Sequence, residues 1–204
     1  MVKHPKISIC IPIHNMQNAD FFLRRLMQSL EIQTFRDFEI VITKEGKMAQ
    51  NTNAAIKKCK GEIIKILYMD DLFYDSQALE KIVSEFEQGA NWVVTGCIHV
   101  TKDGQTVNPH LAKWEGINKG INTIGSPSVM AFINAGDVFF DENLSWVLDT
   151  DLYIRLGEKW GMPNFIDEYL IGIGIGSHQM TNILSDEYKQ QEYEYLQKKQ
   201  GIIR

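Results

Sequence analysis

Residues 61–82, GEIIKILYMDDLFYDSQALEKI, carry an apolar run directly into two adjacent carboxylates, Asp70 and Asp71. The apolar run is typical of a buried strand, and residues 75–89, DSQALEKIVSEFEQG, predict a helix that Gly89 can end. Adjacent negative charges repel each other, and a positive partner such as a metal ion makes them tolerable. The stretch therefore predicts a ligand site at the carboxyl end of a strand.

The same alternation of strand and helix runs through the first hundred residues. Strands are expected at 6–13, 37–43, 61–69 and 91–101, and helices at 19–33 and 75–89. Residues 46–59 predict a loop that passes into a helix, with Asn51, Thr52 or Asn53 as a possible cap. This order predicts an α/β fold with a mostly parallel sheet, helices on both faces and a ligand at the carboxyl ends of the strands.

The second half of the chain has a weaker pattern. Residues 102–125 are rich in turn residues, residues 146–161 predict a helix that ends before Pro163, and residues 185–200 predict a charged helix. In IGIGIG, residues 171–176, glycine occupies every second position. That spacing differs from a dinucleotide-binding loop and indicates a strand on which another segment packs closely.

Composition narrows the class of protein. The chain has 204 residues, of which 44% are hydrophobic and 23% charged, which favours one globular domain. A net charge of −5 argues against a nucleic-acid-binding protein, and no run of apolar residues is long enough for a membrane span. The first residues do not have the pattern of a signal peptide. Cys10, Cys59 and Cys97 are far apart and are expected to be reduced thiols, which predicts a cytoplasmic location.

Several ordered motifs resemble glycosyltransferase family 2. They are ISICIPIHN (7–15), SLEIQTFRDFEIVIT (29–43), NTNAAIKKCKGEIIKILYMDD (51–71), SPSVMAF (126–132) and FDENLSWVLDTDLYIRLGEKWG (140–161). The resemblance implies a single domain over residues 1–204 with the GT-A fold of nucleotide-diphospho-sugar transferases. Residues 1–101 would bind the nucleotide sugar, and residues 102–204 would supply acceptor binding and catalysis. The implied reaction moves a sugar, with inversion, from a nucleotide-diphosphate donor to a hydroxyl of a carbohydrate or glycoconjugate, in glycan or polysaccharide synthesis.

The resemblance also implies the site residues. Asp149 is the expected general base, and Asp151 points about 200° around the same helix, away from it. Trp146 is a candidate platform for the acceptor sugar. The expected ligands of Mn²⁺ or Mg²⁺ are Asp70, Asp71 and His178. The expected donor-binding residues are Pro12, His14, Asn15, Glu45, Asn53, Met69, Asp70 and Asp71.

Departures from the family pattern keep two alternatives open. Lys44, Tyr68 and Leu148 stand where the family has carboxylates. These losses are compatible with a non-catalytic relative that only binds nucleotide sugars. A sugar nucleotidyltransferase has a similar sheet, but it usually opens with a glycine-rich loop, and residues 14–21, HNMQNADF, contain no glycine.

Overall fold

A computed structural model describes residues 4–202. The first half contains β1 (Ile7–Pro12), α1 (Ala19–Glu31), β2 (Phe38–Thr43), α2 (Met48–Lys58), β3 (Ile63–Ile66), β4 (Leu72–Phe73), α3 (Ala78–Glu87) and β5 (Trp92–Val100). The second half contains β6 (Thr106–His110), β7 (Met130–Ile133), α4 (Leu148–Trp160), β8 (Asn164–Gly174), α5 (Met180–Ile183) and α6 (Asp186–Lys199), with short 3₁₀ turns at Ile117–Lys119 and Pro127–Val129. None of the helices in this described part combines the length and apolar character that a bilayer crossing requires.

All strands join one sheet in the order β2-β1-β3-β7-β5-β8-β4, with β6 paired to β5. β1 runs parallel to both β2 and β3, and β5 runs parallel to β8. Since β7 is antiparallel to both β3 and β5, these two strands also point the same way. Five strands therefore share one direction, and the expected α/β fold with a mostly parallel sheet is confirmed.

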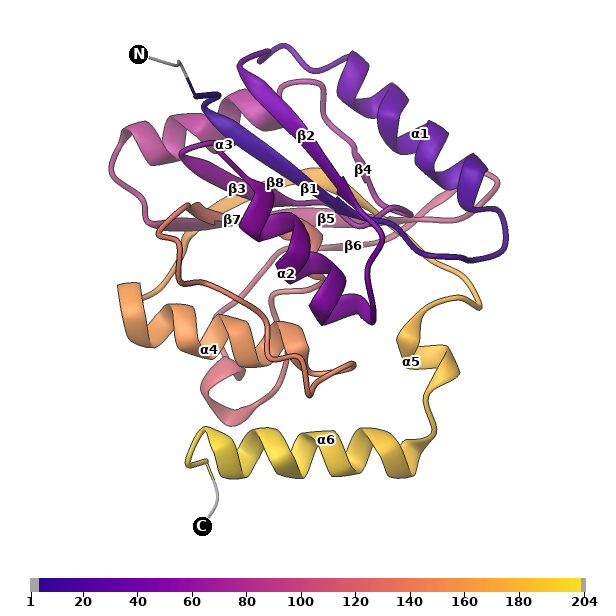
Figure 1. Ribbon diagram of the computed structural model, residues 1–204, viewed down its shortest axis with the longest axis vertical. Helices are drawn as coiled ribbons and strands as arrows, with labels where there is room; N and C mark the ends of the chain where they lie inside the picture. Colours follow the sequence, from indigo (N-terminus) through magenta and orange to yellow (C-terminus); the bar gives the residue numbers. More distant parts are fainter. Residues whose placement is uncertain (1–3, 203–204) are drawn as a thin grey trace.

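Helices cover both faces of this sheet. In Figure 1, α1 and α3 lie above the sheet, α2 and α4 lie below it, and α6 crosses beneath α4. The apolar stripes of the helices explain this arrangement: Phe22, Leu26 and Leu30 of α1 and Leu79, Ile82 and Val83 of α3 are buried. The strand residues between these layers form one continuous apolar core.

The structure corrects the expected start of α2. This helix begins at Met48, so that Asn51, Thr52 and Asn53 lie inside it and do not cap it. The backbone N–H of Lys47 instead donates to the side chain of Gln50 at 3.0 Å, which is half of a capping box. All three residues are buried; Asn51 and Asn53 bond to loops outside the helix, whereas the hydroxyl of Thr52 donates to the carbonyl of Met48 within it.

The third strand is also shorter than expected. β3 ends at Ile66, and a turn follows in which the N–H of Asp71 donates to the carbonyl of Tyr68 at 3.0 Å. Asp70 and Asp71 therefore lie in the turn between β3 and β4, where their side chains leave in different directions.

The alternating glycines of β8 allow this turn to approach the strand closely, as the sequence predicts. A methyl group on Gly174 would overlap the backbone carbonyl of Asp70, and one on Gly172 would lie 3.0 Å from the side chain of Leu72. Gly176 similarly makes room for the ring of His178. These glycines place the end of β8 directly against the acidic turn.

Candidate active site

The carboxylate of Asp70 faces the ring of His178. Nε2 of His178 lies 2.9 Å from Oδ2 of Asp70, although the two residues are more than a hundred positions apart in the chain. The turn itself is held by Arg25 of α1, whose Nη2 donates to the Asp70 carbonyl at 2.7 Å. Arg25 is in turn packed over the ring of Phe22, which also contacts the ring of His178. The pair is therefore positioned by α1 and by the segment after β8.

Asp71 points the opposite way, into the protein. Its side chain is buried, and Oδ1 accepts a hydrogen bond from the N–H of Gly174 at 2.8 Å. Burial, followed by the nearby charge of Asp70, raises the pKa of Asp71 well above its usual range, and the hydroxyl of Ser128 and the charge of Lys65 act in the opposite direction. Asp71 therefore fixes the turn to β8 from within.

The three expected metal ligands are thus divided into a pair and a single residue. Asp70 and His178 are together, whereas the carboxylate of Asp71 faces away from them. Over residues 4–202, no group of three or more His, Cys, Asp or Glu side chains is arranged to hold a metal ion. Two protein ligands still fit a divalent cation that takes its remaining ligands from phosphate oxygens and water, as Mg²⁺ commonly does.

Asp149 lies in the first turn of α4. Its Oδ2 accepts a hydrogen bond from Nδ2 of Asn122 at 2.7 Å, and its Oδ1 accepts one from the N–H of Thr150 at 2.6 Å. Burial raises the pKa of Asp149 to about 6, against the opposing effect of these hydrogen bonds. The result is a carboxylate that is charged at neutral pH and more basic than an ordinary aspartate.

The phenol of Tyr68 responds to both Asp149 and the acidic turn. Its hydroxyl is buried and, within residues 4–202, has no hydrogen-bond partner that meets the usual geometry, with the hydroxyl of Thr52 nearby. Burial, and then the charges of Asp149, Asp71 and Asp70, raise the pKa of Tyr68. Three carboxylates from two distant parts of the chain therefore act on the same buried hydroxyl.

The ends of β1 and β3 bring together part of the expected donor site. Pro12 is buried at the end of β1, while His14 and Asn15 are exposed just after it. The backbone N–H of His14 lies 3.3 Å from Sδ of Met69. Partial desolvation lowers the pKa of His14, while the charge of Asp70 raises it and that of His178 lowers it.

Glu45 and Asn53 make other contacts. Oε1 of the exposed Glu45 accepts from Nζ of Lys58 at 2.8 Å, and Glu45 lines an open hollow of about 440 Å³ beside α2. The buried amide of Asn53 is bonded to both the N–H and the carbonyl of Phe140. Asn53 therefore ties α2 to the segment before α4 and has little capacity left for a ligand.

α6 holds the beginning of α4. Glu192 is buried, and its carboxylate accepts hydrogen bonds from the N–H groups of Ser145, Trp146 and Val147 at 2.8, 2.7 and 3.3 Å. These are amides that the helix itself cannot satisfy, and the negative charge complements the helix dipole. Trp146, the expected acceptor platform, is half-buried next to this cap.

Asp151 faces away from Asp149, as the helical geometry predicts. It is fully buried and pairs with Nε of Arg155 at 2.9 Å, with Nζ of Lys199 at 2.8 Å and with Nε2 of Gln200 at 2.7 Å. These contacts join α4 to the end of α6. Asp151 therefore has a structural role, which separates the two aspartates of this helix.

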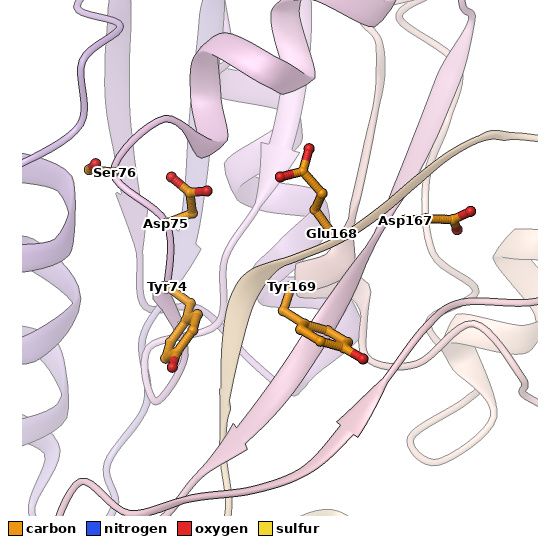
Figure 2. Close-up of a pocket in the computed structure, with 6 residues that line it drawn as sticks. All are labelled: Tyr74, Asp75, Ser76, Asp167, Glu168 and Tyr169. Atoms are coloured by element: carbon orange, nitrogen blue, oxygen red, sulfur yellow. The ribbon is translucent and has the colours of Figure 1, made fainter.

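A larger hollow lies elsewhere, beside β4 and β8. It has a volume of about 590 Å³ and is lined by Tyr74, Asp75, Ser76, Asp167, Glu168 and Tyr169. Figure 2 shows the two tyrosine rings on one side, with the carboxylates of Asp75 and Glu168 pointing away from them. Both of these carboxylates pair with Lys81, at 2.7 and 2.6 Å. No residue of the expected site lines this hollow.

Sequence reasoning missed four side chains that support the site: Arg25, Asn122, Glu192 and Lys65. Lys65 is fully buried in β3, where Nζ donates to the carbonyls of Ile66 and Met130 at 3.0 and 3.3 Å and also contacts the carbonyl of Ser128. A lysine within an apolar strand is a visible signal in the sequence. Arg25 and Glu192 carry no such signal, because their partners are backbone groups far along the chain, and Asn122 carries none because its partner Asp149 lies 27 positions away.

The chain was compared with known proteins. No family model matches it, and no curated protein matches it. Among solved structures, S. aureus TarS 1-349 in complex with UDP-GlcNAc is 15% identical, with a TM-score of 0.68 over 88% of this chain and 61% of that chain. Mannosyltransferase PcManGT from Pyrobaculum calidifontis, in complex with GDP-Man and Mn²⁺, is 12% identical, with a TM-score of 0.61 over 87% of this chain and 59% of that chain.

These similarities establish the fold. The chain has the architecture of these nucleotide-sugar-binding proteins, in agreement with the GT-A fold expected from its motifs. It spans about three-fifths of the length of the TarS 1-349 structures.

Proposed function

We propose that the protein is an inverting, metal-dependent glycosyltransferase of family 2 that uses a nucleotide-diphosphate sugar. The fold of this chain is the fold of transferases that bind UDP-GlcNAc or GDP-Man. The observation that carries the proposal is the Asp70–His178 pair in the acidic turn, with Nε2 and Oδ2 2.9 Å apart. The charges of Asp149 and of this turn both raise the pKa of the buried Tyr68, which supports a candidate base near the candidate cation site.

In this proposal Asp149 accepts the proton of the acceptor hydroxyl. As the hydroxyl oxygen bonds to the anomeric carbon, its proton moves to the Asp149 carboxylate, and the bond between that carbon and the diphosphate oxygen breaks on the opposite face. The hydrogen bonds from Asn122 and Thr150 hold the carboxylate in a fixed orientation. One displacement on one face of the sugar gives inversion.

Asp70 and His178 are the residues that would hold Mn²⁺ or Mg²⁺. The cation supplies positive charge to the departing diphosphate. Arg25 and Asp71 keep the turn in place from the two sides. The residues proposed to bind the nucleoside are Pro12, His14, Asn15, Glu45 and Met69. Trp146 is proposed to bind the acceptor. The donor-binding half of the chain is proposed to end, and the acceptor-binding half to begin, at about residue 101.

A panel of donors tests this proposal. The full chain is incubated with Mn²⁺ and UDP-GlcNAc, GDP-Man or other nucleotide sugars, and release of nucleoside diphosphate is measured. We expect release from at least one donor, and a decrease of about 10²- to 10⁴-fold in Asp149→Asn with donor binding retained.

Two results would oppose the proposal, one against the enzyme assignment and one against the role of Asp149. Donor binding by the wild-type chain without any release supports the non-catalytic relative, for which the carboxylates missing at Lys44, Tyr68 and Leu148 are the motivating observation. Equal release by wild type and Asp149→Asn excludes Asp149 as the base.

A further inference from the structure

Cys10 and Cys59 bring their sulfur atoms together in the core between β1 and α2. Their Sγ atoms lie 3.1 Å apart, although the residues are 49 positions apart in the chain. Both are free thiols. A disulfide bond has an S–S length of about 2.0 Å, so the two atoms need to approach by only about 1 Å.

The surroundings of the two thiols differ. Cys10 is fully buried in β1, whereas Cys59 directly follows α2 and is partly exposed to solvent. The hydrogen bond between the thiols acts on them in opposite senses: together with burial it raises the pKa of Cys10 well above its usual range, whereas it lowers the pKa of Cys59 against the opposing effect of burial. A partly exposed thiol of lowered pKa is the one that reacts with a molecule from solution.

Cys97 offers a contrast within the same chain. It is buried in β5, where burial, and then the charge of Asp71, raise its pKa to about 12. A thiol in that state is inert toward exchange. The chain thus contains one accessible thiol, one buried thiol next to it, and one buried thiol that serves as an internal control.

We propose that Cys10 and Cys59 form an intramolecular disulfide when the protein meets a small disulfide oxidant such as oxidised glutathione. The Cys59 thiolate attacks one glutathione sulfur, the glutathione disulfide breaks, and one glutathione thiolate leaves. Cys10 then attacks Sγ of Cys59, the mixed disulfide breaks, and the second glutathione leaves with the proton from Cys10. Two protein thiols are oxidised by two electrons, and one oxidised glutathione becomes two reduced ones.

The bond would join the middle of β1 to the end of α2. It closes a long loop of the unfolded chain, which stabilises the folded state relative to the unfolded one. For a chain of this size we expect the Tm of the oxidised protein to rise by about 5 °C or more, and to return to its original value when the bond is reduced.

The test uses the full folded chain, first reduced and then treated with oxidised glutathione. Intact mass should fall by the mass of two hydrogen atoms, and peptide mapping should find a Cys10–Cys59 link in a monomer. Cys97→Ser should behave like the wild type. The Cys10→Ser variant should carry a stable glutathione adduct on Cys59. In the Cys59→Ser variant, Cys10 should remain unmodified.

Other results would overturn the proposal. The proposal fails if the treated wild-type protein keeps three free thiols or retains glutathione on Cys59. It also fails if the disulfide involves Cys97 or forms only between chains. Peptide mapping of the wild-type protein gives the answer even if a serine variant does not fold. The outcome does not depend on sugar transfer.

Discussion

The surroundings of Asp149 have opposing effects on its pKa. Burial opposes its negative charge, while the side chain of Asn122 and the N–H of Thr150 favour it. The balance gives a pKa of about 6, close to the range in which a general base both carries its charge at neutral pH and binds a proton well. This is the property expected of the residue that removes the proton of an acceptor hydroxyl.

The pH dependence of turnover follows from this pKa. If the proposed function holds, we expect kcat/KM of the wild-type protein to rise with pH and to level off above about pH 6, because only the deprotonated Asp149 accepts a proton. The measurement is release of nucleoside diphosphate from about pH 5 to about pH 8. The residual rate of Asp149→Asn should lack this transition; the same transition in both proteins would assign it to another group.

The free energy of unfolding should depend on pH through the same raised pKa of Asp149. The folded-state pKa of Asp149, about 6, lies above the unfolded value of about 3.9, so the folded chain binds the proton more tightly. The contribution of this group to stability is fully present below about pH 4 and is lost as the pH rises through about 6. The charged form is therefore destabilising at neutral pH.

Asp149→Asn should remove that penalty. At about pH 8 we expect the variant to be more stable than the wild type by roughly 1–3 kcal/mol, while it loses turnover. Near pH 4 the two proteins should have similar stability, since Asp149 is then protonated. Urea unfolding at both pH values measures the difference, and a variant that is less stable at pH 8 contradicts this account of the residue.

At the scale of the elements, α6 determines where α4 begins. The Glu192 carboxylate satisfies three N–H groups before the first turn of α4, and Asp151 anchors the same helix to Lys199 and Gln200. Because Asp149 belongs to that first turn, α6 controls the position of the candidate base from outside the site.

Glu192→Gln tests this coupling. A neutral amide keeps one acceptor oxygen but loses the charge, so we expect a loss of roughly 1–3 kcal/mol in the free energy of unfolding and a decrease in kcat of about tenfold or more. Glu194→Gln is the matched control, because Glu194 is exposed on the same helix and, within residues 4–202, accepts a hydrogen bond from Gln190 alone, at 2.9 Å. Equal effects of the two substitutions would show that Glu192 does not act through α4.

The sequence predicts the elements of the first half well and those of the second half less well. Strands such as β1 and β5 are continuous apolar runs, and α3 has a clear apolar stripe, so local pattern suffices for them. β7 has four residues, and its place between β3 and β5 depends on pairing with distant strands. The start of α4 at Leu148 depends on the Glu192 carboxylate of α6, a contact that the local pattern of residues 146–161 does not contain.

At the scale of the whole molecule, the candidate site is assembled from segments that are distant in the chain. The resemblance indicated Asp70, Asp149 and His178, and the fold brings Asp70 and His178 into contact. The resemblance could not indicate that the Asp71 side chain points inward, because that direction depends on the close approach of Gly174 to the turn. Residue types can be read from motifs, whereas side-chain directions require the packed structure.

Tyr68 shows how the fold links the parts of the site. It stands at a position where the resembling family has an acid, and its hydroxyl lies where the charges of Asp70, Asp71 and Asp149 act together. An additional carboxylate at this position would add to the repulsion among these groups. With a neutral phenol there, the negative charge toward the proposed cation would come chiefly from Asp70.

Binding of Mn²⁺ in the presence of a nucleoside diphosphate tests the central claim most directly. Free Mn²⁺ is followed by electron paramagnetic resonance as the ion is titrated into the full chain with saturating UDP or GDP. We predict binding that depends on the nucleotide, a Kd for Mn²⁺ that rises by about tenfold or more in Asp70→Asn, and no change in Asp137→Asn, an exposed acid paired with Lys159. A Kd for Mn²⁺ that is the same with and without nucleotide, or the same in wild type and Asp70→Asn, would contradict the claim that Asp70 holds a cation next to the diphosphate.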